Sequence, residues 1–204
     1  MWRLVLLAAA VLIATSCALK NASETSTDNP ELLKILEADQ KDREPQIGQI
    51  DWAQVGPRDA TRRDRVKQLL GAGSVRSGKD FQRAALVFQH GDSSDDILVA
   101  HILAVTALGK GNLDARRMSA NSLDRYLNRI GQPQVFGTQY STPDTKDVRK
   151  WTMDPYHSAL IGDSLREANC VESLVAQQEL LRSLRNGVEP KEPKKKPCET
   201  AAAR

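Results

Sequence analysis

The sequence lacks the short motifs that mark several enzyme classes. It has no Gly-x-Ser-x-Gly segment around a nucleophilic serine, no glycine-rich phosphate loop and no dinucleotide-binding fingerprint. It has no His-Glu-x-x-His pair either, and only three cysteines among 204 residues. These absences leave serine hydrolysis and nucleotide chemistry without support. One long uncharged apolar run is present, and it lies at the N-terminus.

That run, Leu4 to Ala14, predicts export. It is shorter than the roughly 20 residues that span a bilayer, and it follows the basic Arg3, as the core of a signal peptide does. The tetrad that ends at Cys17 resembles a bacterial lipobox, in which cleavage after Ser16 leaves an acylated cysteine as the new N-terminus. We therefore expect residues 1–16 to be a lipoprotein signal peptide and Cys17 to carry acyl chains in the cell membrane or outer membrane. An ordinary secretory signal cut nearby is the alternative.

The rest of the chain is sized for one domain with a hydrophobic core. Residues 17–28 are rich in Ser, Thr, Asn, Asp and Glu, which is typical of a flexible tether. We assign residues 29–187 to a single helical domain and residues 188–204 to a disordered tail rich in Lys and Pro. The anchored domain would face the periplasm or the exterior.

The basic charge is concentrated at the end of the chain. The formal net charge is +3, and five basic against three acidic residues give the stretch from Glu189 onward a net +2. Because Arg3 leaves with the signal peptide, the body of the protein is nearly neutral. We expect no nucleic-acid partner. The Lys-Lys-Lys run at 194–196 is typical of a solvated end, with contact to an anionic lipid or polymer as the alternative.

Two cysteines, Cys170 and Cys198, remain once Cys17 is lipidated. Disulfides persist in exported proteins, and closing this loop would stabilise the fold by about 3 to 4 kcal/mol. Against pairing, Cys198 lies in a tail without helical or strand periodicity, and cysteine number alone does not establish connectivity. The sequence leaves both states open.

Apolar periodicity predicts a mainly α-helical fold of about six helices. The two richest in apolar residues, 79–89 and 94–108, should be central, with Ile102 and Val105 in the core. Short glycine turns around this centre resemble a helical-hairpin repeat, although no side-chain repeat accompanies them. The predicted helices are 30–43, 57–70, 79–89, 94–108, 112–130 and 172–185, with a short turn at 163–166.

After Gly131 the pattern changes. Residues 135–140 are rich in β-formers, 141–147 in turn formers, and 148–153 alternate apolar and polar side chains. These features predict a small β-hairpin over residues 135–153. The expected architecture is mainly α with this single β element.

Several segments together resemble a bacterial family known only as a domain of unknown function. The resemblance covers most of the mature domain, and its most specific parts are the Gln-His pair and the Gly-Thr-Gln segment. The chain differs where the family has a Gly-Trp-Pro element, here Gly71-Ala72-Gly73, and at Cys170, where glycine is usual. The family implies no particular activity. The segments are Val87–Asp92, Ala100-His101, Leu123–Tyr126 and Gln134–Tyr140, with Asp39-Gln40, Arg43, Asp163 and Arg166 beyond them.

Two histidines and a carboxylate, His90, Asp92 and His101, are candidates for metal or acid–base chemistry. Their spacing matches no ligand motif, and His101 lies among apolar neighbours. A core histidine bonded to a carbonyl is the competing interpretation. We predict no metal and no other cofactor.

A second polar group, Asp124 and Arg125 with Gln134, Thr138 and Gln139, lies near the predicted helix-to-hairpin junction. Buried charges require partners, so Arg125 clamping a carboxylate inside the protein is one interpretation. The other is a pocket in which Gln89, His90 and Arg125 orient an anionic or amide-bearing ligand. Asp39 and Arg43 are four positions apart, which is the spacing of an ordinary surface ion pair on a helix. They would contribute to the site only if their side of the helix faces the interior of the protein.

These observations favour a membrane-anchored envelope lipoprotein that acts as a binding or interaction module. Its partner would be an envelope protein or a small polar ligand, bound by a patch of Gln89, His90, Asp124, Arg125 and Gln139. The alternative is an envelope hydrolase that uses a polar cleft around His90, Asp124 and Arg125. Binding is favoured because no nucleophile or carboxylate pair has the spacing of a known mechanism.

Overall fold

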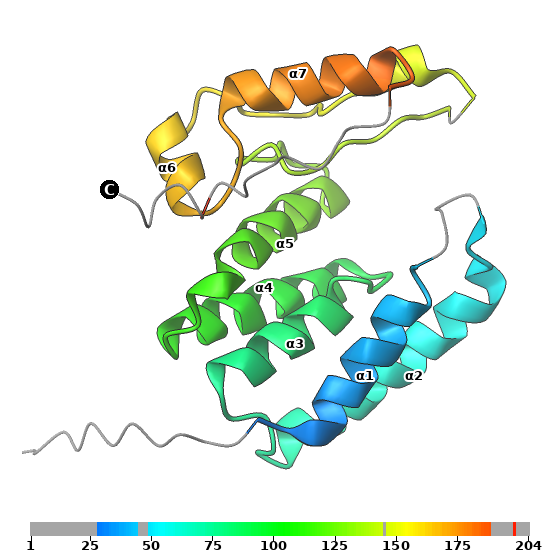
Figure 1. The fold of residues 1–204 in the computed structure, drawn as a ribbon, viewed down its shortest axis with the longest axis vertical. Helices are drawn as coiled ribbons and strands as arrows, with labels where there is room; N and C mark the ends of the chain where they lie inside the picture. Colours follow the sequence, from blue (N-terminus) through cyan, green and yellow to red (C-terminus); the bar gives the residue numbers. More distant parts are fainter. Residues whose placement is uncertain (1–27, 45–48, 145, 189–197, 199–204) are drawn as a thin grey trace, which may run out of the picture.

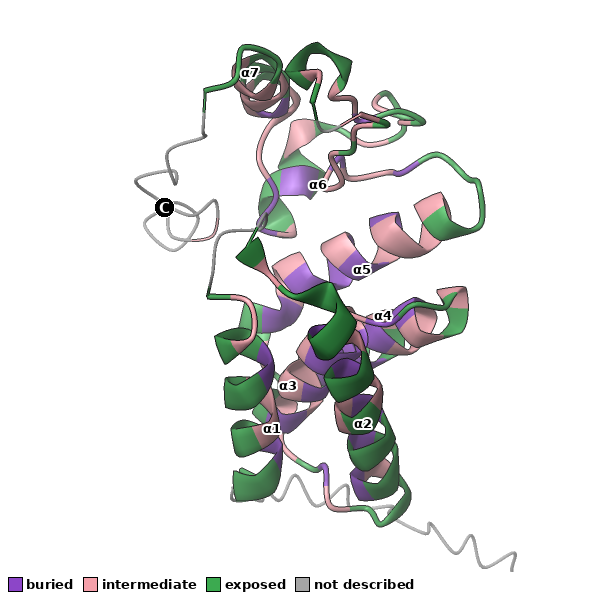
Figure 2. Cartoon of the chain, turned by 90° about the vertical axis from the view of Figure 1, so that its right-hand side faces the viewer, coloured by how far each residue is buried: buried purple, intermediate pink, exposed green. Residues whose placement is uncertain are grey.

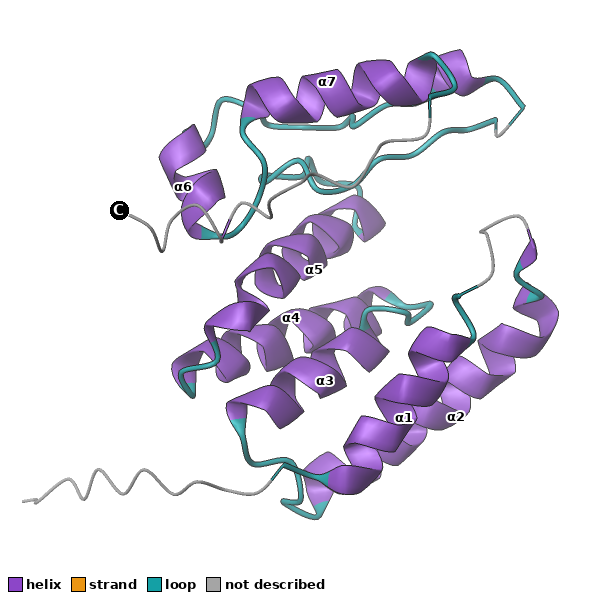
Figure 3. Cartoon of the chain, in the orientation of Figure 1, coloured by secondary structure: helices purple, strands orange, loops and turns teal. Residues whose placement is uncertain are grey.

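The computed structural model describes residues 28–44, 49–144, 146–188 and 198. Over these residues the fold is helical, and Figure 3 shows helices and loops without a drawn strand. The predictions for the signal peptide, for Cys17, for most of the tether and for the tail other than Val188 and Cys198 lie outside the described residues. No helix in the described part is both long and apolar enough to cross a membrane. The α-helices are α1 (Pro30–Lys41), α2 (Trp52–Gly71), α3 (Gly78–Phe88), α4 (Ser94–Gly109), α5 (Arg116–Arg129), α6 (Asp163–Ala168) and α7 (Leu174–Arg185).

Local capping explains where several of the helices begin. Asn29 caps α1, because its side-chain oxygen accepts hydrogen bonds from the amides of Glu31 and Leu32. Ser77 and Asp80 form a reciprocal capping box at the start of α3. The buried Asp80 also accepts a hydrogen bond from the amide of Asn29 at 2.9 Å. One carboxylate thus fixes the starts of two helices.

Helix α2 begins earlier than predicted. It starts at Trp52, capped by Asp51, and Pro57 lies inside it. Proline is a common first-turn residue, which is why the sequence pattern placed the start near Pro57. The cap upstream decides the boundary, and the remaining six predicted helical segments agree with the structure to within a few residues.

Helices α3, α4 and α5 form the centre of the molecule (Figure 1), and α1 and α2 pack beside α3. Their shared core consists of buried apolar side chains, and Figure 2 marks the buried residues of these helices in purple. Two predicted core residues are exceptions, because Ile102 and Val105 of α4 are exposed. The prediction for these two residues was wrong, since α4 is apolar on every side and periodicity cannot show which side faces inward. Fully buried core side chains include Leu32, Val66, Ala84, Phe88, Ala100 and Ala104.

The predicted hairpin is reduced to isolated bridges. Ser141 and Thr152 form one antiparallel bridge, and Gln134 and Tyr156 form one parallel bridge. Between them the backbone is bonded to buried side chains instead of to a neighbouring strand. This segment separates α5 from α7 (Figure 1) and supplies Gln134, Thr138 and Gln139 of the predicted site.

Candidate functional site

Asp124 has a structural role. Its fully buried carboxylate accepts hydrogen bonds from the amides of Val135 at 2.7 Å, Phe136 at 2.9 Å and Thr138 at 2.9 Å. The hydroxyl of Thr138 donates a fourth, at 2.8 Å. Since these bonds occupy both carboxylate oxygens, Asp124 and Thr138 hold the 135–138 loop against α5.

Gln134 is structural for the same reason. Its buried amide donates to the carbonyls of Gln139 and Met153, and its carbonyl accepts from the amide of Gln139 at 2.9 Å. Gly137, which lies between Gln134 and Gln139 in the sequence, has φ +81°, and a Cβ there would lie 2.6 Å from the Tyr156 hydroxyl. The loop therefore closes tightly enough to admit only glycine at this position.

Arg125 directly follows Asp124 on α5, but the two side chains do not pair. Its Nε donates to Oε1 of Gln139 at 3.2 Å, and its Nη1 donates to the carbonyl of Gln89 at 2.8 Å. Among the described residues no carboxylate forms an ion pair with Arg125. The interpretation of an internal carboxylate clamp is therefore wrong.

Two further arginines lie near Arg125. Burial, together with the nearby charges of Arg129 and Arg43, lowers the pKa of the Arg125 guanidinium from its ordinary value. The group still carries its charge at neutral pH, because an arginine guanidinium is not deprotonated in proteins. A half-buried cation without a counter-charge attracts an anion.

His90 follows Gln89, whose carbonyl accepts from Arg125, and its side chain contacts α1. Its Nδ1 lies 3.1 Å from Oδ1 of Asp39, a fully buried carboxylate. Arg43 donates to the same oxygen at 3.1 Å and binds Asp59 of α2 at 2.5 Å. The Asp39–Arg43 pair thus faces inward and joins two helices to the candidate site. In the described part of the chain, Nε2 of His90 makes no hydrogen bond.

The remaining predicted residues lie apart from this group. The Asp92 side chain is 86% exposed and lies 3.3 Å from Arg63. His101 bonds through Nδ1 to the carbonyl of Ser119 at 3.0 Å, between α4 and α5. No cluster of three His, Cys, Asp or Glu side chains within the described ranges could hold a metal ion.

The structure therefore brings together part of the predicted site. We call Gln89, His90, Arg125 and Gln139, with Arg43 behind them, the Arg125 patch. The sequence did not indicate Asp39 as the partner of His90, because the two residues are 51 positions apart. A shallow hollow elsewhere on α2 is lined by Pro57, Arg58, Thr61 and Arg62 and includes none of the predicted residues.

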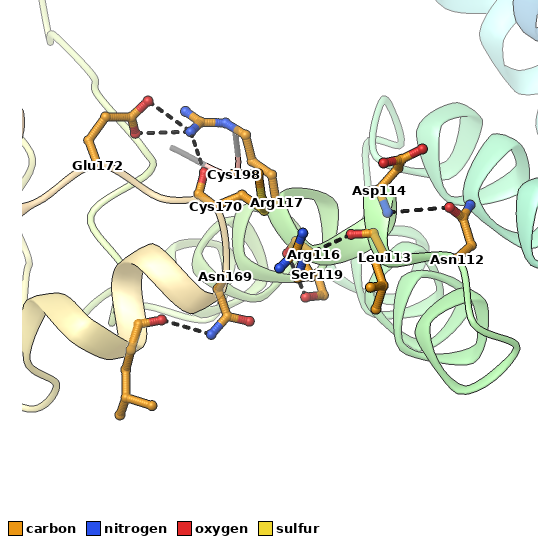
Figure 4. The surroundings of a disulfide bond; sticks show 11 residues. Asn112, Leu113, Asp114, Arg116, Arg117, Ser119, Asn169, Cys170, Glu172 and Cys198 are labelled. Atoms are coloured by element: carbon orange, nitrogen blue, oxygen red, sulfur yellow. Dashed lines mark hydrogen bonds and ion pairs between the residues drawn. A yellow bond between two sulfur atoms is a disulfide. The ribbon is translucent and has the colours of Figure 1, made fainter. Parts of the chain in front are cut away.

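Cys170 and Cys198 form a disulfide with Cα atoms 4.8 Å apart (Figure 4). Cys170 has φ +59°, a left-handed conformation that favours glycine. Arg117 of α5 donates to the Cys170 carbonyl at 2.9 Å and to Glu172 at 2.8 Å. The disulfide therefore joins the chain's end to the turn between α6 and α7, beside α5.

Comparison with known proteins adds no assignment, since no family model, curated protein or solved structure matches this chain.

Proposed function

We propose that this protein is a lipid-anchored lipoprotein of a bacterial envelope, in the family that its Gln-His and Gly-Thr-Gln segments resemble. Cys17 carries the anchor, and the helical domain faces the periplasm or the exterior. The domain is a binding module that takes a small anionic ligand at the Arg125 patch.

The state of Arg125 carries the binding proposal. Buried or half-buried arginines are normally balanced by a carboxylate, because an uncompensated charge is costly to desolvate. The acidic groups near the patch, Asp39 and Asp59, already bind Arg43, and Asp124 binds backbone amides. Arg125 therefore retains binding capacity for a group outside the chain. Arginine geometry suits a carboxylate or a phosphate.

Binding is tested with acetate and inorganic phosphate as probes, at constant ionic strength set with chloride. We expect saturable changes in the amide NMR signals of His90 and Gln139. The variant Arg125→Gln should lose them while its melting temperature stays close to that of the wild type. Arg182→Gln is the matched control, because Arg182 is an exposed arginine on α7. A wild-type protein that responds no differently to these anions than to chloride would contradict the proposal.

The anchor is tested separately. Mass spectrometry of the native N-terminus should show an acylated Cys17, and Cys17→Ser should abolish the acylation. An unmodified terminus at Ala18 or Lys20 would assign an ordinary secretory signal instead.

Hydrolysis is the second candidate function, and the contact between Asp39 and His90 favours it. A carboxylate at Nδ1 orients the imidazole and leaves Nε2 able to take a proton from water. Within the described residues no serine, threonine or cysteine side chain bonds to His90, so water would be the nucleophile. Turnover of p-nitrophenyl acetate that is lost in both His90→Gln and Asp39→Asn, with folding intact, would support hydrolysis. Equal rates in all three proteins would contradict it.

A further inference from the structure

Helix α4 has an apolar face that no described element covers. The stretch from Ile97 to Gly109 contains no charged residue. Its inner side is buried against α3 and α5. On the opposite side Ile102 is 54% exposed and Val105 is 48% exposed. We call Leu98, Ile102, Val105 and Gly109 the α4 outer face.

The spacing of this face is that of a helix–helix seam. Its four residues are separated by four, three and four positions, so they form one straight stripe along the helix. A helix exposed on one side ordinarily carries charged residues there, whereas a helix that is apolar all round is ordinarily covered on all sides. The pattern thus indicates a missing partner for α4.

The stripe is complementary to itself when two copies run antiparallel. A twofold axis through its midpoint places Ile102 opposite Val105 of the second copy, and Leu98 opposite Gly109 of the second copy. Gly109 can receive a large side chain, since a Cβ built there meets no atom within 4 Å. A large residue therefore faces a small one at each end of the pair.

The charges at the two ends of α4 agree with the same arrangement. Asp95 lies on the stripe in the first turn, and Lys110 follows the last turn beside the stripe, on the side of α3. An antiparallel pair brings the acidic end of one helix beside the basic end of the other, which the helix dipoles also favour. A parallel pair would place like charges together. Lys110 stays exposed, with its ammonium 5.6 Å from the centre of the Phe81 ring.

From this complementarity we infer that the protein self-associates as a twofold, antiparallel dimer through the α4 outer face. One helix face on each copy is a small contact, in the size range of weak and transient complexes. The dimer therefore forms in a concentration-dependent manner, and anchoring two copies on one membrane would strengthen it.

The test is analytical ultracentrifugation of the full chain carrying Cys17→Ser, over a series of concentrations. The wild-type sequence should shift toward dimer as concentration rises. Ile102→Glu should remain monomeric, because it places an unpaired charge in the seam. Val175→Glu is the matched control, since it changes a 63% exposed residue on α7, and it should behave as the wild type. Circular dichroism should show the same helix content for all of them.

A mixing experiment tests the antiparallel register. Ile102→Glu and Val105→Lys should each be monomeric alone, and an equimolar mixture should dimerise, because the new charges face each other only in the antiparallel pair. A monomeric wild type at every concentration would overturn the inference. Equal loss of the dimer in Ile102→Glu and Val175→Glu would also overturn the inference. A monomer that binds phosphatidylcholine vesicles through Ile102 would assign the face to lipid and overturn it as well.

Discussion

Single buried polar side chains organise the C-terminal half of this protein. Asp124 and Gln134 bond to the backbone where a strand ladder was predicted. Arg166, which is 1% exposed, also bonds to the backbone, in the segment before α6. It donates to the carbonyls of Ser158 and Ile161 at 2.7 and 2.8 Å. Each side chain is satisfied by several partners, so the segment stays ordered without a sheet.

At this scale, replacing Asp124 by alanine should be strongly destabilising. The change leaves three partly buried backbone amides and one hydroxyl without their acceptor, and we expect the free energy of unfolding to fall by about 3 kcal/mol. Urea denaturation measures the loss. Asp92→Ala is the control, and it should change stability little because Asp92 is exposed. Equal stability of the two variants would show that Asp124 does not hold the loop.

At the scale of elements, the fold joins well-capped helices through side chains that are distant in sequence. The capping box of α3 also fixes the start of α1, and His90 after α3 reaches Asp39 on α1. The disulfide also joins parts of the chain that are distant in sequence, because it connects the α6–α7 turn to Cys198. Most packing is local, and a few long-range bonds set how the elements are placed.

Removing the disulfide should therefore destabilise the protein. The bond closes a loop with a sequence separation of 28, for which chain entropy predicts a loss of about 3 to 4 kcal/mol. We expect that loss for Cys170→Ser with Cys198→Ser, measured by urea denaturation. Cys170→Gly with Cys198→Ser should recover about 1 kcal/mol, because glycine adopts φ +59° without strain. Two free thiols in the denatured, unreduced wild type would exclude the bond.

At the scale of the whole molecule, stability should depend on pH most clearly on the alkaline side. Burial raises the pKa of Tyr140, helped by Glu172 and Tyr156, and burial also raises the pKa of Tyr156. Unfolding returns both phenols to their ordinary pKa of 10.0. Above that pH the unfolded chain releases protons that the folded chain keeps, so the unfolded state is favoured.

The free energy of unfolding should thus be constant from neutral pH to about pH 9 and decline above pH 10. Tyr140→Phe should reduce that decline, because it removes one of the two groups. Denaturant titrations of both proteins at several alkaline pH values measure the slopes. Parallel slopes would show that Tyr140 does not contribute.

Local sequence patterns determined the helices of this protein. Apolar periodicity, the Asn29-Pro30 start and the glycine turns act within one or two helical turns, so they can be interpreted without a fold. Residue type indicated a polar group near the helix-to-hairpin junction, and Gln89 and His90 as members of a ligand pocket with Arg125. The members of the polar group are Asp124, Arg125, Gln134, Thr138 and Gln139. The sequence also raised the pairing of Cys170 with Cys198 without deciding it.

Tertiary structure alone decided which of these groups are free and which are bound. The partners of Asp124 lie 11 to 14 positions away and Asp39 lies 51 positions from His90, and no local periodicity encodes such distances. Only packing shows that Asp124 holds a loop in place, that Arg125 has no carboxylate partner among the described residues, and that Ile102 and Val105 face outward. A helix that is apolar on every side has no preferred inner face until its neighbours are in place.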